Sequence, residues 1–560
     1  MQEWWLQAKR VVTAAVGAKR IGKPVFVRIV TTAASAATEA MAAGLVQSAS
    51  EWFGQGPVRL TAMGDSSARH TAVLAEWGRG QTALVCAAEC GQGPARVEVV
   101  VIGPRGTINW EQGGDPDTER AGQMGGEAPP APAGLRQAIG RSLRSGQTVG
   151  LDVPETQPLP GPPEPVAPGL PPEARGAGRL RPTAPPFGVL LVSGAHTHQE
   201  NYWDGFATDP RCRLIAVADE REVSPRRQRL NEQLARKLGI PSLPDLARAL
   251  GREDVQIVSV VGDPERRARL IVDCARAGKH LYLDKPLAAS AEEAAGVVAA
   301  VDEAGVVSQM FSQVRSAPAV RLKQLVESGR LGRLRAIHLD LTFAKGPAGT
   351  APADRPRRET AAPSRFETVD AKRELFNVGV YPLVLLEWLL GRPVRRVRAV
   401  TANYFFAEHL RRDMEDFAAV LLELEGGLVA SLAVGRTGWR SHPMGGLNRA
   451  CVIGTQGLAS VDAYRPRCEV WADQAPWLPP PVDPEDPMGF WKSTLERIPS
   501  GPKQAWVMPP YDGPGDVAYF LDCVQHGRAS DVSARVGAAA VCTLMAAYQS
   551  AATGRVVALA

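Results

Sequence analysis

Short apolar runs alternate with amphipathic stretches between residues 187 and 311. The helical stretches have recognisable starts, such as Ser224 before Pro225 and the Ser290–Glu293 capping box. Strands buried on both faces are expected at 188–194, 213–219, 255–262, 280–284 and 306–311, where the sequences are "GVLLVSG", "RLIAVAD", "VQIVSVVG", "HLYLD" and "VVSQMF". The alternation predicts a parallel, doubly wound Rossmann domain over residues 187–311.

The pattern changes after residue 312. A helix is expected at 318–328, followed by long strands such as "LRAIHLDLTF" (334–343) and "FAAVLLELEGGLVASLAV", where a Gly-Gly pair supplies the turn. Long strands joined by hairpins, with few helices, are typical of an open antiparallel sheet. Residues 312–560 are therefore predicted to form an α+β domain.

Proline divides the chain once more. Twelve of the 36 residues from 152 to 187 are proline, which excludes a helix or a central strand and predicts an extended spacer over 153–186. Residues 1–152 then form a separate first unit. A length of 560 residues agrees with two to four domains.

Composition narrows the class of protein. The net charge of +5 comes from 64 basic and 59 acidic residues without a basic stripe, so a nucleic-acid partner is not expected. No apolar run approaches a membrane span, although 11–18 resembles a weak signal core without a cleavage site. Eight cysteines without zinc spacing predict buried thiols, a cytoplasmic location and no metal.

Five segments in the second half resemble one known family. "AGKHLYLDKPLA" (277–288) is similar to the "AGKHV…EKP" signature of the glucose-fructose oxidoreductase, inositol dehydrogenase and MocA (Gfo/Idh/MocA) family. The resemblance spans about 187–560 and includes segments 313–334, 375–393, 452–461 and 546–559, in the family's order. It implies an NAD(P)-dependent oxidoreductase acting on a sugar, cyclitol or related hydroxylated small molecule.

The first unit resembles the last. Colinear matches join 15–30 with 325–341, 51–59 with 387–395, 72–80 with 419–427, 101–110 with 452–461, and 138–151 with 546–559. We infer a shortened second copy of the family's sheet domain, the alternative being chance similarity between Ala/Gly-rich segments. The resemblance implies association through the sheet, as a homo-oligomer or as an internal pseudo-dimer that the N-terminal copy completes.

The first strand should deliver a glycine-rich turn to a dinucleotide pyrophosphate. In "SGAHTHQENYW" only Gly194 remains of GxGxxG, and the resemblance suggests that His196 and His198 stand beside the phosphates. Alternatives are ordinary polar loop residues or a metal pair, for which no third ligand is evident.

Further cofactor contacts are expected at strand ends. Asp219 can accept both ribose hydroxyls of NAD, although Arg221 leaves NADP open and a capping role is the alternative. By resemblance, the cofactor side also includes Gly262, Asp263, Pro264, Asp284, Pro286, Gln313 and Arg315.

Lys285 follows the fourth strand, at the edge where open α/β sheets bind ligands. By resemblance it exchanges a proton with the substrate oxygen during hydride transfer. The family's Asp-x-x-x-His or Asp-x-x-x-Tyr positions hold Asn377 and Tyr381, and the missing carboxylate puts turnover in doubt. The first unit has Met41 and Leu45 there, which excludes a second active site.

A loop after a predicted strand offers further polar groups. Arg436, Arg440 and His442 are candidates for gripping a hydroxylated or anionic substrate, or are ordinary loop residues. The favoured function is an NAD(P)-dependent dehydrogenase with acid/base roles for Lys285 and Tyr381. The alternative is a catalytically weak nucleotide-binding sensor or scaffold that keeps the fold.

Overall fold

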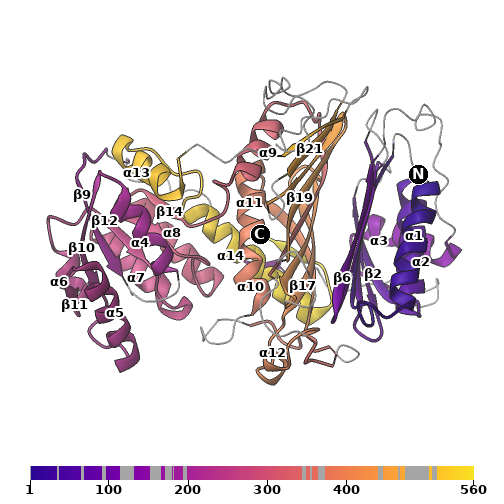
Figure 1. Ribbon diagram of the computed structural model, residues 1–560, viewed down its shortest axis with the longest axis horizontal. Helices are drawn as coiled ribbons and strands as arrows, with labels where there is room; N and C mark the ends of the chain where they lie inside the picture. Colours follow the sequence, from indigo (N-terminus) through magenta and orange to yellow (C-terminus); the bar gives the residue numbers. More distant parts are fainter. Residues whose placement is uncertain are drawn as a thin grey trace, which may run out of the picture.

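The chain folds into three units arranged side by side (Figure 1). The computed structural model describes residues 2–33, 37–64, 69–90, 96–113, 131–151, 166–170, 180, 182–192, 198–343, 349–352, 356–363, 373–438, 446–463, 467–472, 503–507 and 514–560. A Rossmann domain lies at one end, the C-terminal sheet domain in the middle and the N-terminal sheet domain at the other end.

The Rossmann domain has a parallel sheet, as predicted, with six strands in the order β11-β10-β9-β12-β13-β14, of which the short edge strand β11 was not expected. Its strands are β9 (Phe187–Val192), β10 (Cys212–Ala218), β11 (Ser242–Leu243), β12 (Ile257–Val260), β13 (His280–Leu283) and β14 (Ser308–Met310). Its helices are α4 (Gln199–Thr208), α5 (Pro225–Leu238), α6 (Leu246–Leu250), α7 (Pro264–Arg276) and α8 (Ala291–Ala304). Ser224 and Ser290 cap α5 and α8 by accepting backbone N–H bonds at 3.2 and 3.1 Å.

The C-terminal domain has a ten-stranded sheet in the order β22-β21-β20-β19-β15-β18-β17-β16-β23-β8. Its strands are β15 (Leu334–Phe343), β16 (Val394–Ala402), β17 (Phe417–Leu424), β18 (Val429–Arg436), β19 (Gly446–Gly454), β20 (Gly457–Asp462), β21 (Arg467–Ala472), β22 (Lys503–Val507), β23 (Val557–Leu559) and β8 (Val166–Ala167). Its helices are α9 (Ala317–Glu327), α10 (Glu374–Val378), α11 (Val380–Leu390), α12 (Ala407–Arg411), α13 (Asp516–His526) and α14 (Ala534–Thr553).

The C-terminal sheet, predicted to be an open antiparallel sheet, contains one parallel pair at its centre. β15 pairs with β18 in parallel, while β16, β17 and β19 follow the antiparallel pattern. Parallel neighbours need a crossover connection, and the chain between β15 and β18 supplies one through α10, α11, β16 and β17. Edge strand β8 comes from the proline-rich spacer and pairs in parallel with β23.

The last segments of the chain return to the Rossmann domain. Phe520 and Leu521 of α13 share an apolar cluster with Phe206 and Tyr282, and α14 packs against both α8 and β16. α14 is long and apolar enough to cross a membrane by composition, yet most of it is buried within the protein. The hydropathy of α14 is therefore that of a core helix. Because α13 and α14 pack on the Rossmann domain, the boundary between the two domains is less sharp than a division of the chain at residue 312.

The N-terminal domain has a seven-stranded sheet in the order β6-β5-β1-β4-β3-β2-β7. Its strands are β1 (Phe26–Ala33), β2 (Pro57–Gly64), β3 (His70–Trp77), β4 (Thr82–Glu89), β5 (Arg96–Gly103), β6 (Gly106–Gly113) and β7 (Val149–Gly150). Its helices are α1 (Gln2–Gly17), α2 (Thr38–Phe53) and α3 (Ala133–Ser145), all on one side of the sheet (Figure 1).

Seven strands of each sheet correspond in order and direction. The N-terminal order β6-β5-β1-β4-β3-β2-β7 corresponds, strand by strand, to β20-β19-β15-β18-β17-β16-β23 in the C-terminal sheet. The pair β1–β4 is parallel, and so is the corresponding pair β15–β18. The registers correspond too. Phe26 pairs with Thr82 and Ile102, and Ala336, 310 residues later, pairs with Val429 and Ile453.

The helix-free faces of these two sheets pack together (Figure 1). One apolar cluster joins both sheets, with the rings of Phe26 and Phe417 4.9 Å apart. Charged pairs are buried in the same interface, including Arg28–Asp340 at 2.7 Å and Glu98–Arg449 at 2.8 Å. Interfaces of this kind need every charge paired, because an unpaired buried charge is costly.

Candidate active site

Lys285 lies where the Rossmann domain meets helices α10 and α11. It directly follows β13 and Asp284, and only 4% of its surface is exposed. Its Nζ donates to the backbone carbonyl of Asn377 at 2.8 Å and to Asn377 Oδ1 at 2.9 Å. The same nitrogen lies 4.8 Å from the centroid of the Tyr381 ring. The structure thus brings together the three residues predicted to be catalytic.

A buried carboxylate lies behind Asn377. Glu374 is fully buried and accepts from Asn377 Nδ2 at 3.1 Å. It also contacts His409 Nε2 at 3.3 Å and Arg436 Nε at 3.0 Å. Burial by itself would raise the pKa of Glu374, but His409, Arg436 and Asn377 outweigh it and hold the pKa below the ordinary value. Glu374 is therefore an anion at neutral pH.

On the other side of Lys285, Asp284 is fully buried among polar partners. His198 Nδ1 and the Tyr202 hydroxyl both lie 2.7 Å from Asp284 Oδ1, and Arg267 donates to Oδ2 at 2.8 Å. Burial opposes ionisation, but Arg267, His198 and Lys285 hold the pKa of Asp284 well below its usual range. His198 thus contacts the residue beside the lysine.

The edge around Lys285 fits a dinucleotide cofactor. Strand order reverses between β9 and β12, and ligands of open α/β sheets bind beyond the carboxyl ends at such a point. Ser312 lies two residues beyond the end of β14 at this edge, is 4% exposed, and its Oγ has no hydrogen-bond partner among the described residues. A buried hydroxyl left unpaired is costly, so a bound polar group would be accommodated there.

Asp219, predicted to bind the cofactor ribose, has several protein partners at the end of β10. Its carboxylate is 2% exposed and accepts from Arg266 at 2.6 Å, Asn231 at 2.8 Å and the backbone N–H of Glu220 at 2.9 Å. The acid meant to repel a 2′-phosphate is thus paired with an arginine. Arg221, the residue that left NADP open, pairs with Asp245 at 2.5 Å.

The remaining cofactor candidates have mainly structural contacts. Asp263 pairs with Arg227, and Arg315 pairs with Asp531 at 2.5 Å and stacks on Tyr519. The Gly262 and Pro286 carbonyls accept from Arg267, and Pro264 is the first residue of α7. Gly194, His196, Arg440 and His442 lie outside the described residues.

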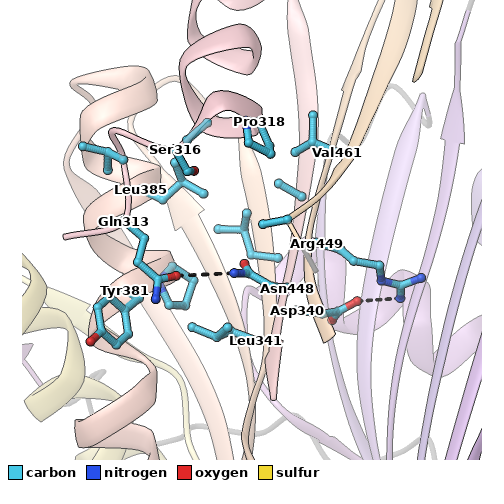
Figure 2. Close-up of a pocket in the computed structure, with 16 residues that line it drawn as sticks. Gln313, Ser316, Pro318, Asp340, Leu341, Tyr381, Leu385, Asn448, Arg449 and Val461 are labelled. Atoms are coloured by element: carbon cyan, nitrogen blue, oxygen red, sulfur yellow. Dashed lines mark hydrogen bonds and ion pairs between the residues drawn. The ribbon is translucent and has the colours of Figure 1, made fainter. Parts of the chain in front are cut away.

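A pocket opens between α9, α11 and the helix-covered face of the C-terminal sheet (Figure 2). Gln313 faces Asn448 across it, 3.4 Å apart, and Pro318, Leu341 and Leu385 add apolar walls. Tyr381 lies at its margin with the hydroxyl directed away from Asn448 (Figure 2). The pocket therefore adjoins the lysine site and combines amides with apolar surface.

Several polar site residues were missed from the sequence. Glu374 was detectable, because Glu-x-x-Asn places both side chains on one helical face. Arg267, Arg266 and Asn448 gave no local signal, since the side chains that they contact, Asp284, Asp219 and Gln313, lie on other elements. Arg436, a candidate for substrate binding, contacts Glu374. The described residues contain no cluster suited to a metal ion.

Two family models match this part of the chain. Residues 190–312 match the oxidoreductase family with an NAD-binding Rossmann fold, and residues 319–460 match the GFO/IDH/MocA C-terminal domain. Residues 190–460 belong to the Gfo/Idh/MocA family. This part of the chain thus has the NAD-binding Rossmann domain of an oxidoreductase family, and the predicted fold class is confirmed for both matched domains.

Curated relatives are similar to about half of the chain. Scyllo-inositol 2-dehydrogenase (NAD(+)) of Bacillus subtilis (strain 168) is 26% identical over 262 residues, which cover 46% of this chain and 68% of the relative. A dTDP-3,4-didehydro-2,6-dideoxy-alpha-D-glucose 3-reductase of Streptomyces violaceoruber is 26% identical, covering 47% and 68%. The solved structure of levoglucosan dehydrogenase with NADH shares the fold, at 19% identity and a TM-score of 0.50, covering 66% of this chain and 98% of that chain.

Proposed function

We propose that this protein oxidises or reduces a carbinol carbon of a sugar, cyclitol or related hydroxylated molecule, with NAD as the hydride carrier. The observation that carries the proposal is the buried Lys285 ammonium, held by Asn377 beside Tyr381 at the ligand-binding edge of the Rossmann sheet. Curated relatives act on an inositol and on a dTDP-sugar, which supports the substrate class.

Lys285 is proposed to exchange the proton of the substrate oxygen. Its two hydrogen bonds to Asn377 hold the nitrogen in place at the ligand-binding edge, where an ammonium can donate to a substrate oxygen. Tyr381 is proposed to stand beside this oxygen and relay the proton. When bound, the nicotinamide supplies or accepts the hydride. The residues proposed to hold the cofactor are those of the strand ends, from Asp219 to Asp284, together with Ser312.

The test combines binding and turnover. NADH and NADPH are titrated by fluorescence, and hydride transfer is then screened over inositols, sugars and nucleotide sugars by absorbance at the nicotinamide band. Lys285→Met should lower kcat by roughly 10²-fold or more, the scale of a lost acid/base catalyst, with NADH affinity retained. Full activity in that variant would refute the role.

A binding protein of low activity is the second candidate. It is favoured by Asn377 in place of the family's aspartate and by the pairing of Asp219 with Arg266. NADH binding without turnover of any compound in the panel would select this candidate.

We also propose that the N-terminal domain is a duplicated sheet domain acting as a built-in dimer partner. The equal strand order and registers and the shared apolar cluster support it. Light scattering should then show that the full chain does not pair through this covered face. A cytoplasmic location stays a prediction, with which the free cysteines of the described residues agree.

A further inference from the structure

The amide of Asn377 has only one orientation that satisfies both neighbours. The Lys285 ammonium can only donate and the ionised Glu374 carboxylate can only accept. Oδ1 therefore faces Lys285, at 2.9 Å, and Nδ2 faces Glu374, at 3.1 Å. The three side chains form a continuous polar chain from a fully buried anion to the lysine.

These hydrogen bonds give a physical reason for an asparagine, and not an aspartate, at position 377. With Glu374 in place, an aspartate at 377 would set two carboxylates against each other at hydrogen-bond distance, and like charges disfavour joint ionisation. An asparagine meets no such repulsion. The carboxylate absent from position 377 is present three residues earlier, on the same face of α10.

We propose that Glu374 is the positioning residue for Lys285, supplying through the Asn377 amide the negative charge that keeps the lysine oriented and protonated. This proposal deepens the proposed function and rests on it for the catalytic meaning of Lys285. Glu374 touches no reacting atom. Its effect comes through Asn377, which it orients, and through its charge.

Other charged groups around the lysine must be held constant in any test. Asp284 precedes Lys285 and is balanced by His198 and Arg267, while His409 and Arg436 balance Glu374 from α12 and β18. Tyr381 presents its ring to the ammonium from α11. None of these groups is altered in the variants below.

The test measures Lys285 directly, without a substrate. The full chain is labelled with ¹³C at lysine Cε, and because it contains eleven lysines the Lys285 resonance is assignable with Lys285→Arg. In Glu374→Gln the titration midpoint of Lys285 should fall by about one pH unit, because an opposite charge has been lost. Glu387→Gln, which changes a partly buried glutamate of α11, is the matched control and should leave the midpoint unchanged.

A charge swap separates positioning from mere packing. Glu374→Gln with Asn377→Asp returns one carboxylate to the chain, and the glutamine amide can donate to it. This double variant should restore the midpoint to the wild-type value. An unchanged midpoint in folded Glu374→Gln overturns the proposal, and so does a lowered midpoint that the double variant leaves low. If Glu374→Gln does not fold, Asn377→Leu decides: a lowered midpoint supports the proposal and an unchanged one overturns it.

Turnover gives an independent readout. With any substrate found, Glu374→Gln should lower kcat about 10-fold, part of the contribution of a positioned acid/base group, while KM changes little. If the wild-type protein turns over nothing, the proposed function fails, whereas the lysine titration still judges the link to Glu374.

Discussion

The two packed sheet domains have equal frameworks and unequal chemistry. Both have the same order and registers over seven strands. Next to one sheet, α10 and α11 present Asn377 and Tyr381 to Lys285. In the other, α2 has Met41 and Leu45 at the matching positions, each 1% exposed in an apolar core. The same framework thus carries polar side chains beside Lys285 in one domain and apolar side chains at the matching positions of the other.

The interface between them is complementary rather than self-complementary. Glu98 and Arg449 occupy corresponding positions on β5 and β19, yet contact each other at 2.8 Å. Arg28 and His338 also correspond, and both bond Ser431 Oγ, at 2.9 and 2.7 Å. In a pair of identical C-terminal sheets, corresponding residues near a twofold axis would meet their own kind, so Arg449 would face arginine.

Removing the N-terminal domain should have the largest effect on the protein, because it uncovers one face of the C-terminal sheet. A chain of residues 180–560 exposes the apolar face that includes Phe417 and Leu421. Large exposed apolar patches drive association, so light scattering should show higher-order species and lower solubility than for the full chain. Equal mass and solubility of the two proteins would contradict the covering role.

The substitution Glu98→Arg should have the second-largest effect, a loss of stability at the interface between the two sheets. Loss of one partner of a buried pair costs about 3–5 kcal/mol, and a like charge beside Arg449 adds to this. We expect the free energy of unfolding in urea to fall by more than about 5 kcal/mol. Glu98→Gln is the milder control, and a loss below about 1 kcal/mol in Glu98→Arg would show that the pair is not buried in solution.

The correspondence of Arg28 and His338 predicts a pH effect. Burial, followed by the nearby Arg28, lowers the pKa of His338 to about 3. The unfolded imidazole titrates near pH ~6.5, so its contribution is present above that pH and is lost as pH falls toward about 3. From pH 7 to 5 this group alone should cost about 2 kcal/mol.

Urea unfolding at both pH values checks this contribution. His338→Gln should lose that part of the pH dependence, while the part from His280, whose pKa burial lowers to about 4, should stay. The same pH dependence in wild type and variant would contradict the assignment.

The smallest expected effects come from substitutions at the helix positions that differ between the two domains, Tyr381 in α11 and Met41 in α2. Tyr381→Phe should lower kcat about 10-fold by removing a proton relay, with little change in stability. Met41→Leu is close in volume, so it should cost less than about 1.5 kcal/mol and leave kcat unchanged. Steady-state kinetics and thermal unfolding of both variants check the contrast, which fails if Met41→Leu changes turnover or Tyr381→Phe does not.

Local patterns predicted the Rossmann domain well. Continuous apolar runs located its main strands within a few residues, and Ser224 and Ser290 cap helices as expected. Lys285, Asn377 and Tyr381 came from motif resemblance and lie together. These features depend on residues close in sequence or on a shared motif, which is why a single sequence contains them.

Other features depend on pairing between distant residues. The parallel β15–β18 pair was missed because the hydrophobic pattern of a strand does not indicate which strand it will pair with. Asp219 looked free for a ribose because its partner Arg266 lies on another element. Arg436 looked available for substrate, yet a glutamate 62 residues earlier holds it. Ion pairs of this kind appear only once the fold is known.

The order of the sheets along the chain has a consequence for biosynthesis. Arg28 and Ser431 are bonded although 403 residues separate them. At a translation rate of roughly 5–20 residues per second, the first sheet waits about 20–80 seconds for the strands that shield it. During that interval the apolar face of the N-terminal sheet is exposed on the nascent protein at the ribosome. We expect chaperones to bind this face until the C-terminal sheet covers it.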